Sequence, residues 1–259
     1  MVESKMAEYS TMRDSGIDWI GAIPFAWETH TLYQLVTQVK NKNSDLSEQN
    51  LLSLSYGKIK RKDINSNGGL LPESFNGYNI IEDGDIVLRL TDLQNDHTSL
   101  RVGRTTERGI ITSAYTTLRP ISKESSKYLY YLLHAFDLKK GFYGMGSGVR
   151  QGLNYDEVKE LRVILPSEAE QSSIAAYLDE QCAKIDALIE EARASIEEYK
   201  QWKASLIFEA VTKGLDQNVE MKDSGVEWIG QIPIDWVSFK LRTCFDEIGS
   251  GTTPKSDID

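Results

Sequence analysis

The stretch MRDSGIDWIGAIPFAW at residues 12–27 decides how this chain is organised, because it returns as MKDSGVEWIGQIPIDW at residues 221–236. The second copy follows the first after 209 residues without a gap, and ten of the sixteen positions are identical. Four of the five tryptophans occupy matching places in the two copies. Solenoid repeats have periods of roughly 20–50 residues, so this period corresponds to a whole domain with a connector. The sequence therefore predicts one complete module followed by the start of a second.

The composition is that of a globular chain. It has 259 residues, 40% of them hydrophobic, and no apolar run approaches the ~18 residues of a membrane span. Cys182 and Cys244 are far apart and lack the spacing of a zinc site or a disulfide framework. The N-terminus has neither the basic start nor the apolar stretch of a signal peptide. We therefore expect a cytoplasmic location, no membrane association and no metal site.

The net charge of −10 is unevenly distributed along the chain. Residues 166–259 carry the entire acidic excess, whereas residues 1–165 balance at zero. Within that neutral part, residues 101–165 are rich in basic side chains. A basic face on a neutral domain would suit phosphate binding, and ordinary surface charge would give the same pattern.

Residues 1–166 have the pattern of a mixed α+β domain. β-Branched and aromatic residues bounded by turn formers and prolines indicate strands, and Tyr, Leu and Phe at helical spacing indicate a helix. Asn154 and Glu157 have the spacing of a helix capping box. The predicted strands are 85–90, 110–118 and 161–165, and the predicted helices are 127–138 and 154–160.

A long helix is predicted next. Ser167 and Glu170 have the spacing of a capping box, no Pro or Gly follows up to Lys213, and Gly214 supplies a stop. Its apolar residues follow a heptad seam, and the stripe of so long a helix needs a partner. We predict coiled-coil-like pairing with a second similar helix; the alternative is packing along its own domain. The seam residues are Leu178, Ile185, Leu188, Ala192, Tyr199, Trp202 and Leu206.

A series of motifs lies in a fixed order along the chain. They occupy residues 14–21 with Pro24 and Trp27, then 84–87, 90–96, 109–115, 150–153, 165–166, 170–171, 174, 177–179 and 223–230. In order and spacing they resemble the DNA-specificity subunit of type I restriction–modification enzymes. The resemblance covers essentially the whole chain.

The resemblance implies a target-recognition domain at residues 1–166, a spacer and dimerisation helix at 167–214, and a linker with the start of a second module at 215–259. Full-length members of this family hold two modules, whose long helices pack antiparallel and whose domains each read half of a split DNA site. This chain stops some 39 residues into the second module and so resembles a half-subunit. Pairing with a second copy would restore two-fold architecture and read a symmetric split site.

Known catalytic motifs are missing from the sequence. It contains no GxxxxGK[ST] phosphate loop, no HExxH and no GxSxG, and its histidines, His30, His97 and His134, are widely separated. We therefore predict a non-catalytic subunit that binds no cofactor itself, which disfavours a stand-alone enzyme. The resemblance implies that the methylation subunit and the restriction subunit supply the catalysis, with S-adenosylmethionine, ATP and Mg²⁺ bound there.

Three stretches are candidates for contact with duplex DNA. Lys and Arg bind phosphates, Arg also suits guanine and Gln adenine, and glycines let the backbone approach a phosphate closely. A solvated loop or a turn-rich connector would give the same patterns. The first stretch holds Lys58, Lys60, Arg61 and Lys62, the second Arg89, Thr91, Arg101 and Arg104, and the third Tyr143, Ser147, Arg150 and Gln151.

The repeated tryptophans carry no charges suited to DNA, and we expect them to have a structural role. The second copy, with Trp228 and Trp236, is expected to dock on the helix end of a partner copy or to be partly disordered. For the whole chain, the main prediction is sequence-specific DNA recognition. The alternative is an assembly or regulatory fragment that occupies partner subunits without productive DNA reading.

Overall fold

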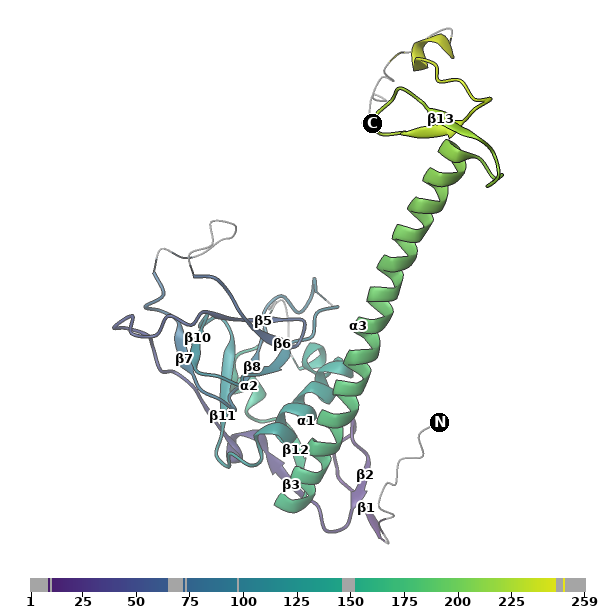
Figure 1. Cartoon of the computed structure of the whole chain (residues 1–259). Helices are drawn as coiled ribbons and strands as arrows, with labels where there is room; N and C mark the ends of the chain where they lie inside the picture. Colours follow the sequence, from purple (N-terminus) through teal and green to yellow (C-terminus); the bar gives the residue numbers. More distant parts are fainter. Residues whose placement is uncertain are drawn as a thin grey trace, which may run out of the picture. The chain divides into compact units, whose positions relative to one another are not determined.

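The computed structural model describes residues 9, 11–64, 72, 74–96, 98–145, 152–245 and 249. Its contacts divide the chain into two compact units, Met1–Cys182 and Ala183–Asp259, and the division falls inside the long helix α3 (Glu168–Lys213). Figure 1 shows the many short strands of the first unit and α3 in green. None of the helices in the described residues is both long enough and apolar enough to cross a membrane.

The centre of the first unit is a four-stranded antiparallel sheet. Its strand order is β4 (Val36–Gln38), β11 (Thr116–Pro120), β8 (Ile86–Leu88) and β9 (Val102–Arg104). Strand β8 consists of three consecutive apolar residues and is buried along its whole length, as expected for a strand that meets the core on both faces.

Four two-stranded antiparallel ladders complete the first unit. One of them, between β3 and β12, brings a segment near the start of the chain next to the strand that leads into α3. The ladders are β1 (Met12–Asp14) with β2 (Ala22–Pro24), β3 (Glu28–Thr31) with β12 (Arg162–Leu165), β5 (Leu52–Ser55) with β6 (Lys58–Arg61), and β7 (Asn79–Ile81) with β10 (Gly109–Ile111).

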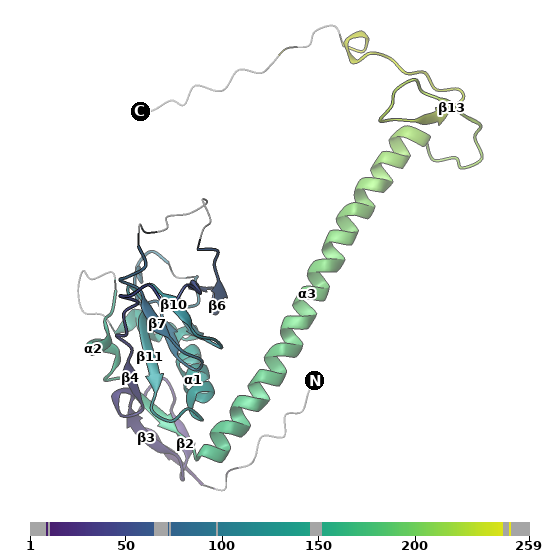
Figure 2. The same ribbon diagram turned by 60° about the vertical axis from the view of Figure 1, so that its left-hand side comes forward.

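Helix α1 (Ser126–Leu138) covers the sheet. It contacts β9 and β11, and its buried Leu129 and Leu133 belong to the largest apolar cluster of the unit. Figure 2 shows α1 between the sheet and the first turns of α3, where the Tyr131 hydroxyl donates to Asp179 Oδ1 at 2.7 Å. Three short elements complete the unit: η1 (Leu32–Gln34), η2 (Gly141–Gly144) and α2 (Tyr155–Val158).

The strand predicted at 110–118 is in fact two strands, β10 and β11. The chain turns between them because the Thr112 hydroxyl accepts a hydrogen bond from the Ala114 amide at 3.3 Å. The Tyr115 amide also donates to the Thr112 carbonyl at 3.2 Å. A side-chain-to-backbone turn of this kind interrupts a run of residues whose propensity is otherwise for strand.

The other predicted elements of this domain are confirmed, with small differences at their ends. The strands predicted at 85–90 and 161–165 are β8 and β12, and the predicted helices are α1 and α2. The capping box of α2 is present: the Glu157 amide donates to Asn154 Oδ1 at 3.2 Å, and the Asn154 amide donates to Glu157 Oε2 at 2.9 Å.

Helix α3 begins and ends where the sequence predicts. At its start the Ser167 hydroxyl accepts from the Glu170 amide at 3.4 Å. The Glu170 carboxylate, expected to accept from the Ser167 amide, accepts instead from the Ser167 hydroxyl, the Tyr9 hydroxyl and the Trp27 indole N–H. Gly214 ends the helix with a φ of 77°, a left-handed conformation that favours glycine. An α+β domain followed by one long helix is thus confirmed.

The second copy of the repeat folds in the second unit as the first copy does in the first. Strand β13 (Met221–Asp223) pairs with β14 (Gln231–Pro233) in the register of β1 with β2. Asp14 and Asp223 each accept the amide two residues later at 2.9 Å. A 3-10 turn, η3 (Leu241–Thr243), lies 209 residues after η1, so the structural repeat extends beyond the sixteen matching residues.

Candidate nucleic-acid interface

The first predicted stretch lies on a tight β-hairpin rather than on a loop. Strands β5 and β6 are joined by Tyr56 and Gly57, whose φ angles of 47° and 77° are typical of a two-residue hairpin turn. A Cβ on Gly57 would lie 3.1 Å from the Leu100 Cβ, so the turn packs closely on the segment before β9. The hairpin is therefore held against the domain.

Three lysines project from one face of β6 and the residue that follows it. Lys58, Lys60 and Lys62 are two residues apart, which places their side chains on the same side of an extended strand, and all three are exposed. Ile59 points the other way and packs against the cluster that contains Leu54. We call Lys58, Lys60 and Lys62 the lysine face. Such a row of cations suits the phosphates of a nucleic acid backbone.

Arg61 has a different position. Its guanidinium forms an ion pair with Glu107, with Nε to Oε2 at 2.8 Å. The Arg61 hydrogen bond holds the pKa of the Glu107 carboxyl below its ordinary value. Asn50 Nδ2 donates to the same carboxylate at 2.8 Å. Arg61 therefore ties β6 to the β9–β10 connection.

Arg101, in the second predicted stretch, is fully buried, with 0% of its surface exposed. Its guanidinium donates to the backbone carbonyls of four residues: Arg89, Thr91, Asp92 and Asp96. Its Nε donates to the Tyr143 hydroxyl at 2.8 Å. This arrangement argues against the predicted DNA contact, because a guanidinium whose donors are used inside the core does not reach a base or phosphate.

Tyr143, from the third stretch, belongs to the same buried network. Its hydroxyl accepts from Arg101 and donates to the Asp96 carbonyl at 2.9 Å, and the Arg101 guanidinium lies 5.1 Å from its ring centroid. The network closes the loop before β9, so Tyr143 has a structural position there. Ser147, Arg150 and Gln151, the other candidates of this stretch, lie outside the described residues.

The remaining residues of the second stretch surround this loop. Arg104 is mostly buried and donates to Ser126 Oγ at 2.9 Å, which joins β9 to the start of α1. Arg89 is about one-third exposed and lies 3.7 Å from Asp96 Oδ2. Hydrogen bonds from Ser99 hold the pKa of the Asp96 carboxyl well below its ordinary value. The Thr91 side chain is exposed, so Arg89 and Thr91 remain candidates at this loop.

Tyr56 is the residue that sequence reasoning did not select. It is 73% exposed at the tip of the β5–β6 hairpin, beside the lysine face. Its positive φ is uncommon for a bulky residue and favours glycine at this position. The available sequence signal for a tight turn was a Tyr-Gly pair between two short stretches in which polar and apolar residues alternate.

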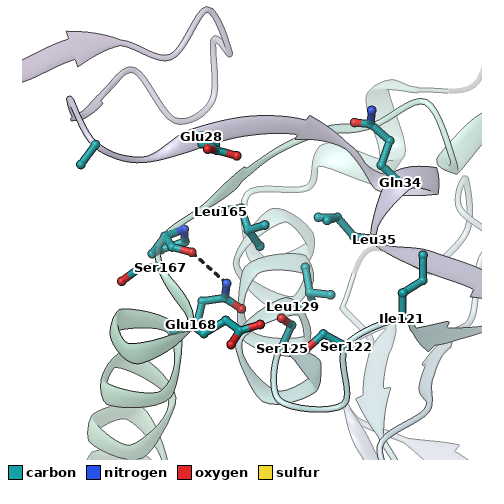
Figure 3. A pocket seen from close by; sticks show the side chains of 13 residues that line it. Glu28, Gln34, Leu35, Ile121, Ser122, Ser125, Leu129, Leu165, Ser167 and Glu168 are labelled. Carbon is teal, nitrogen blue, oxygen red and sulfur yellow. Dashed lines mark hydrogen bonds between the residues drawn. The ribbon is translucent and has the colours of Figure 1, made fainter.

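A cleft of about 400 Å³ lies elsewhere on the first unit, where β3, the corner between β12 and α3, and the start of α1 meet. Figure 3 shows Glu28 and Glu168 among its lining residues, with Leu129 and Leu165. Its described lining contains two carboxylates and neither Lys nor Arg. Such a lining repels phosphate, so the cleft does not belong to the candidate DNA surface.

The predicted seam of α3 is exposed along most of its length. Leu178, at the first turns, is partly buried, whereas Tyr199 and Trp202 are 66% and 61% exposed. Their rings lie 6.5 Å apart, centroid to centroid. The other four seam residues, Ile185, Leu188, Ala192 and Leu206, are also exposed. Contiguous exposed apolar surface of this kind marks an interaction site.

Two further features bear on chemistry. Within the described part of the chain, no group of three or more His, Cys, Asp or Glu side chains is placed to hold a metal ion. Cys182 and Cys244 are both exposed free thiols.

Comparison with solved structures finds several similar chains. A chain from a study of complex assembly and conformational transition of the type I system is 15% identical, with a TM-score of 0.51. The specificity subunit of Thermoanaerobacter tengcongensis is 16% identical with a TM-score of 0.45, and that of M. genitalium is 18% identical with a TM-score of 0.44.

These matches cover different shares of the two partners. They include 74%, 79% and 77% of this chain, in the order given above, but only 47%, 48% and 52% of the solved chains. This chain thus spans about half the length of those solved chains. A comparison with curated proteins finds no match.

The family comparison is decisive for identity. The family described as the type I restriction modification DNA specificity domain matches residues 24–198, which is more than half of the chain. The matched region runs from β2 through the first domain and well into α3. The chain therefore belongs to the family of type I restriction–modification DNA specificity domains.

Proposed function

We propose that this chain recognises duplex DNA as the specificity subunit of a type I restriction–modification complex, with one half-site read by each chain. Family membership over residues 24–198 is the observation that carries the proposal. The described surface supplies a chemical basis for it, because the lysine face lies beside the exposed ring of Tyr56 on a hairpin held against the domain.

The residues divide by the kind of contact each can make. Lys58, Lys60 and Lys62 offer sequence-independent attraction for phosphates, which fixes register and orientation on a duplex. Arg89 and Thr91 border the neighbouring loop and can donate to base edges or phosphates. Arg150 and Gln151 keep their predicted role as donors for guanine and adenine. Arg101 and Tyr143 are left out of this set because the buried network uses their polar atoms.

The exposed seam of α3 supports a second part of the proposal, that two copies pair through this helix. An apolar stripe at heptad spacing gains stability when a similar helix covers it. The family pattern favours the antiparallel arrangement, which relates two copies by a two-fold axis. Two domains related in this way would read a symmetric site whose halves are separated by a spacer.

The chain itself is proposed to be non-catalytic and to bind no cofactor. Methyl transfer and cleavage would belong to a methylation subunit and a restriction subunit, where S-adenosylmethionine, ATP and Mg²⁺ would bind. In this arrangement the chain selects the DNA sequence, and its partner subunits carry out catalysis.

A binding titration tests DNA recognition directly. The chain and its methylation subunit are titrated with duplex DNA that carries the genomic methylation motif of the source strain. Lys60→Ala with Lys62→Ala is compared with Lys123→Ala, which removes an exposed cation from the β11–α1 connection. We expect the double variant to bind at least tenfold more weakly and to lose about two from the slope of log K against log salt. Equal binding by all three proteins would contradict the role of the lysine face.

The same titration separates this function from the assembly role. A chain that occupies partner subunits without reading DNA would form the complex with the methylation subunit. It would not discriminate the motif from a scrambled duplex. Discrimination that survives at physiological salt supports recognition.

A further inference from the structure

The two copies of the repeat offer the same backbone but differ in what covers them. Hairpin 1 is β1 with β2, residues 12–24, and hairpin 2 is β13 with β14, residues 221–233. Glycines at matching places, Gly21 and Gly230, have φ angles of 78° and 71°. The amides of Ile17 and Val226 donate in the same way, each to the serine hydroxyl two residues earlier at 3.1 Å. The hairpin is therefore a preformed unit, made by its own sequence.

Hairpin 1 is seated in a socket formed by α1 and β12. The Trp19 ring packs on Phe136 of α1, with 5.1 Å between ring centroids. Arg162 of β12 donates from Nη1 to the Gly16 carbonyl at 3.0 Å. Ile17 and Ile23 are buried in the apolar cluster that also contains Phe136. We call Phe136, Arg162 and this cluster the α1–β12 socket.

Hairpin 2 has only one covered side. Ile232 is buried, and a Cβ on Gly214 would lie 3.3 Å from the Trp236 ring and 3.8 Å from Pro233, so this side rests on the end of α3. Trp228 occupies the position of Trp19 but is 71% exposed. The described residues of its own unit thus leave the Trp228 ring uncovered, whereas the matching ring of Trp19 packs on Phe136.

We propose that hairpin 2 binds the α1–β12 socket of a second copy of this chain, in exchange for hairpin 1. The socket is chosen because hairpin 1 demonstrates the fit: the same Trp, Ile and Gly positions meet Phe136, the apolar cluster and Arg162. Exchange of an equivalent element between copies is a low-cost route to association, because the leaving hairpin and the entering hairpin meet the same side chains.

Three sequence differences set the balance between the two hairpins. Arg13 donates to the Phe25 carbonyl, and also to that of Trp27, whereas Lys222 lacks a second donor group in fixed geometry. Ala26, which lines the acidic cleft beside Glu28 and Glu168, is replaced by Asp235. The third is Ile17, whose larger side chain fills the socket where the second copy has a valine. Hairpin 1 is therefore the better occupant, and exchange becomes measurable when its hold is weakened.

This inference rests on the proposed pairing of two copies through α3, since pairing raises the effective concentration of hairpin 2 near a partner's socket. Residues 214–220 link the end of α3 to hairpin 2, so the hairpin travels with that helix end. Failure of pairing and failure of exchange must then be distinguished by separate readouts.

The test uses the full chain labelled with 5-fluorotryptophan, in wild-type form and as Trp19→Ala. Fluorine NMR follows the Trp228 signal, which Trp228→Phe assigns, and light scattering on the same samples gives the mass. In Trp19→Ala we expect the Trp228 signal to shift and to lose at least half of its H₂O-to-D₂O isotope shift as the protein concentration rises. Wild-type chain, with hairpin 1 in place, should retain that isotope shift.

A second measurement keeps the test independent of the folding of one variant. Melting temperatures of Trp19→Phe, a milder change, and of Trp19→Phe with Trp228→Ala are followed over a hundredfold range of concentration. If exchange occurs, the melting temperature of Trp19→Phe should rise more steeply with protein concentration than that of wild type. The melting temperature of Trp19→Phe with Trp228→Ala should not. Dimers in which Trp228 stays solvent-exposed and both variants melt alike would overturn exchange and leave pairing intact. A chain that stays monomeric throughout would overturn both.

Discussion

The guanidinium of Arg101 donates to the hydroxyl of Tyr143 at 2.8 Å inside the first unit of the chain, where Arg101 is fully buried. Both residues belong to stretches that the sequence marks as candidates for DNA contact, yet here they hold the loop before β9. Buried arginines are rare because their charge must be compensated by hydrogen bonds, and Arg101 meets that need with backbone carbonyls. The buried Arg101 side chain therefore holds the backbone of the loop that carries Arg89 and Thr91.

Replacing Arg101 should destabilise the domain rather than alter its DNA contacts directly. Arg101→Ala removes the five hydrogen bonds that the buried guanidinium donates to four backbone carbonyls and to the Tyr143 hydroxyl. We expect a loss of about 3 kcal/mol or more in the free energy of unfolding. Arg101→Lys should restore little, since an ammonium does not reach the same fork of acceptors. Urea denaturation measures both. Lys60→Ala, an exposed control, should stay within about 0.5 kcal/mol of wild type; a similarly small effect of Arg101→Ala would contradict this assignment.

Tyr56 offers a test in which stability and binding move in opposite directions. Tyr56→Gly removes the Cβ from a left-handed residue and should raise the free energy of unfolding by up to about 1 kcal/mol. It should also weaken DNA binding, because the exposed ring beside the lysine face is lost. Tyr56→Ala separates the effects, since it removes the ring and keeps the Cβ. Unchanged DNA affinity in both variants would assign Tyr56 no part in binding.

His134 predicts a pH dependence of stability. Burial on α1 lowers the pKa of its imidazole below the ordinary value, and its Nδ1 has no hydrogen-bond partner among the described residues. As pH falls through the range between the ordinary and the lowered pKa, the unfolded chain takes up the proton first, so stability falls. Thermal melts between pH 5 and 7 should therefore slope upward with pH. His134→Gln should flatten that slope, and an identical slope in the variant would assign it to other groups.

The seam of α3 predicts the association state. Leu188→Glu places a carboxylate in the exposed apolar stripe, and its burial in a helix pair should weaken the dimer by about 100-fold or more. Ala194→Glu adds the same charge to the same helix, away from the seam, and should leave the dimer unchanged. Analytical ultracentrifugation over a range of concentrations measures both. Equal weakening by the two variants would show that net charge, and not the seam, controls association.

The parts of the fold that follow from local sequence were predictable. The bounds of α3 follow from Ser167 and Gly214, and the capping box of α2 follows from Asn154 and Glu157, because caps act within one turn. The strand predicted at 110–118 differed for a reason just as local, a turn made by Thr112 that strand propensity does not record. Burial does not follow from local sequence, because it depends on which segments meet in space. For this reason the sequence does not reveal that Arg101 is buried and Lys60 is exposed.

The candidate DNA surface was also predictable only in part. Lys58, Lys60 and Lys62 alternate with other residues, and this spacing places them on one face of an extended strand. The ion pair of Arg61 with Glu107 joins residues far apart in sequence, so no local pattern reports it. Tyr56 lies outside the predicted set because that set follows the basic residues, whereas Tyr56 belongs to the turn between β5 and β6.

The most direct test of the central claim is a selection of random duplex DNA by the chain together with the proposed methylation subunit, followed by sequencing. One recognition domain in each of two symmetrically paired copies predicts an enriched motif with two inverted half-sites around a fixed spacer. Lys60→Ala with Lys62→Ala should reduce the enrichment while keeping the same motif. Absence of any enriched sequence, from a complex that assembles normally, would contradict the account.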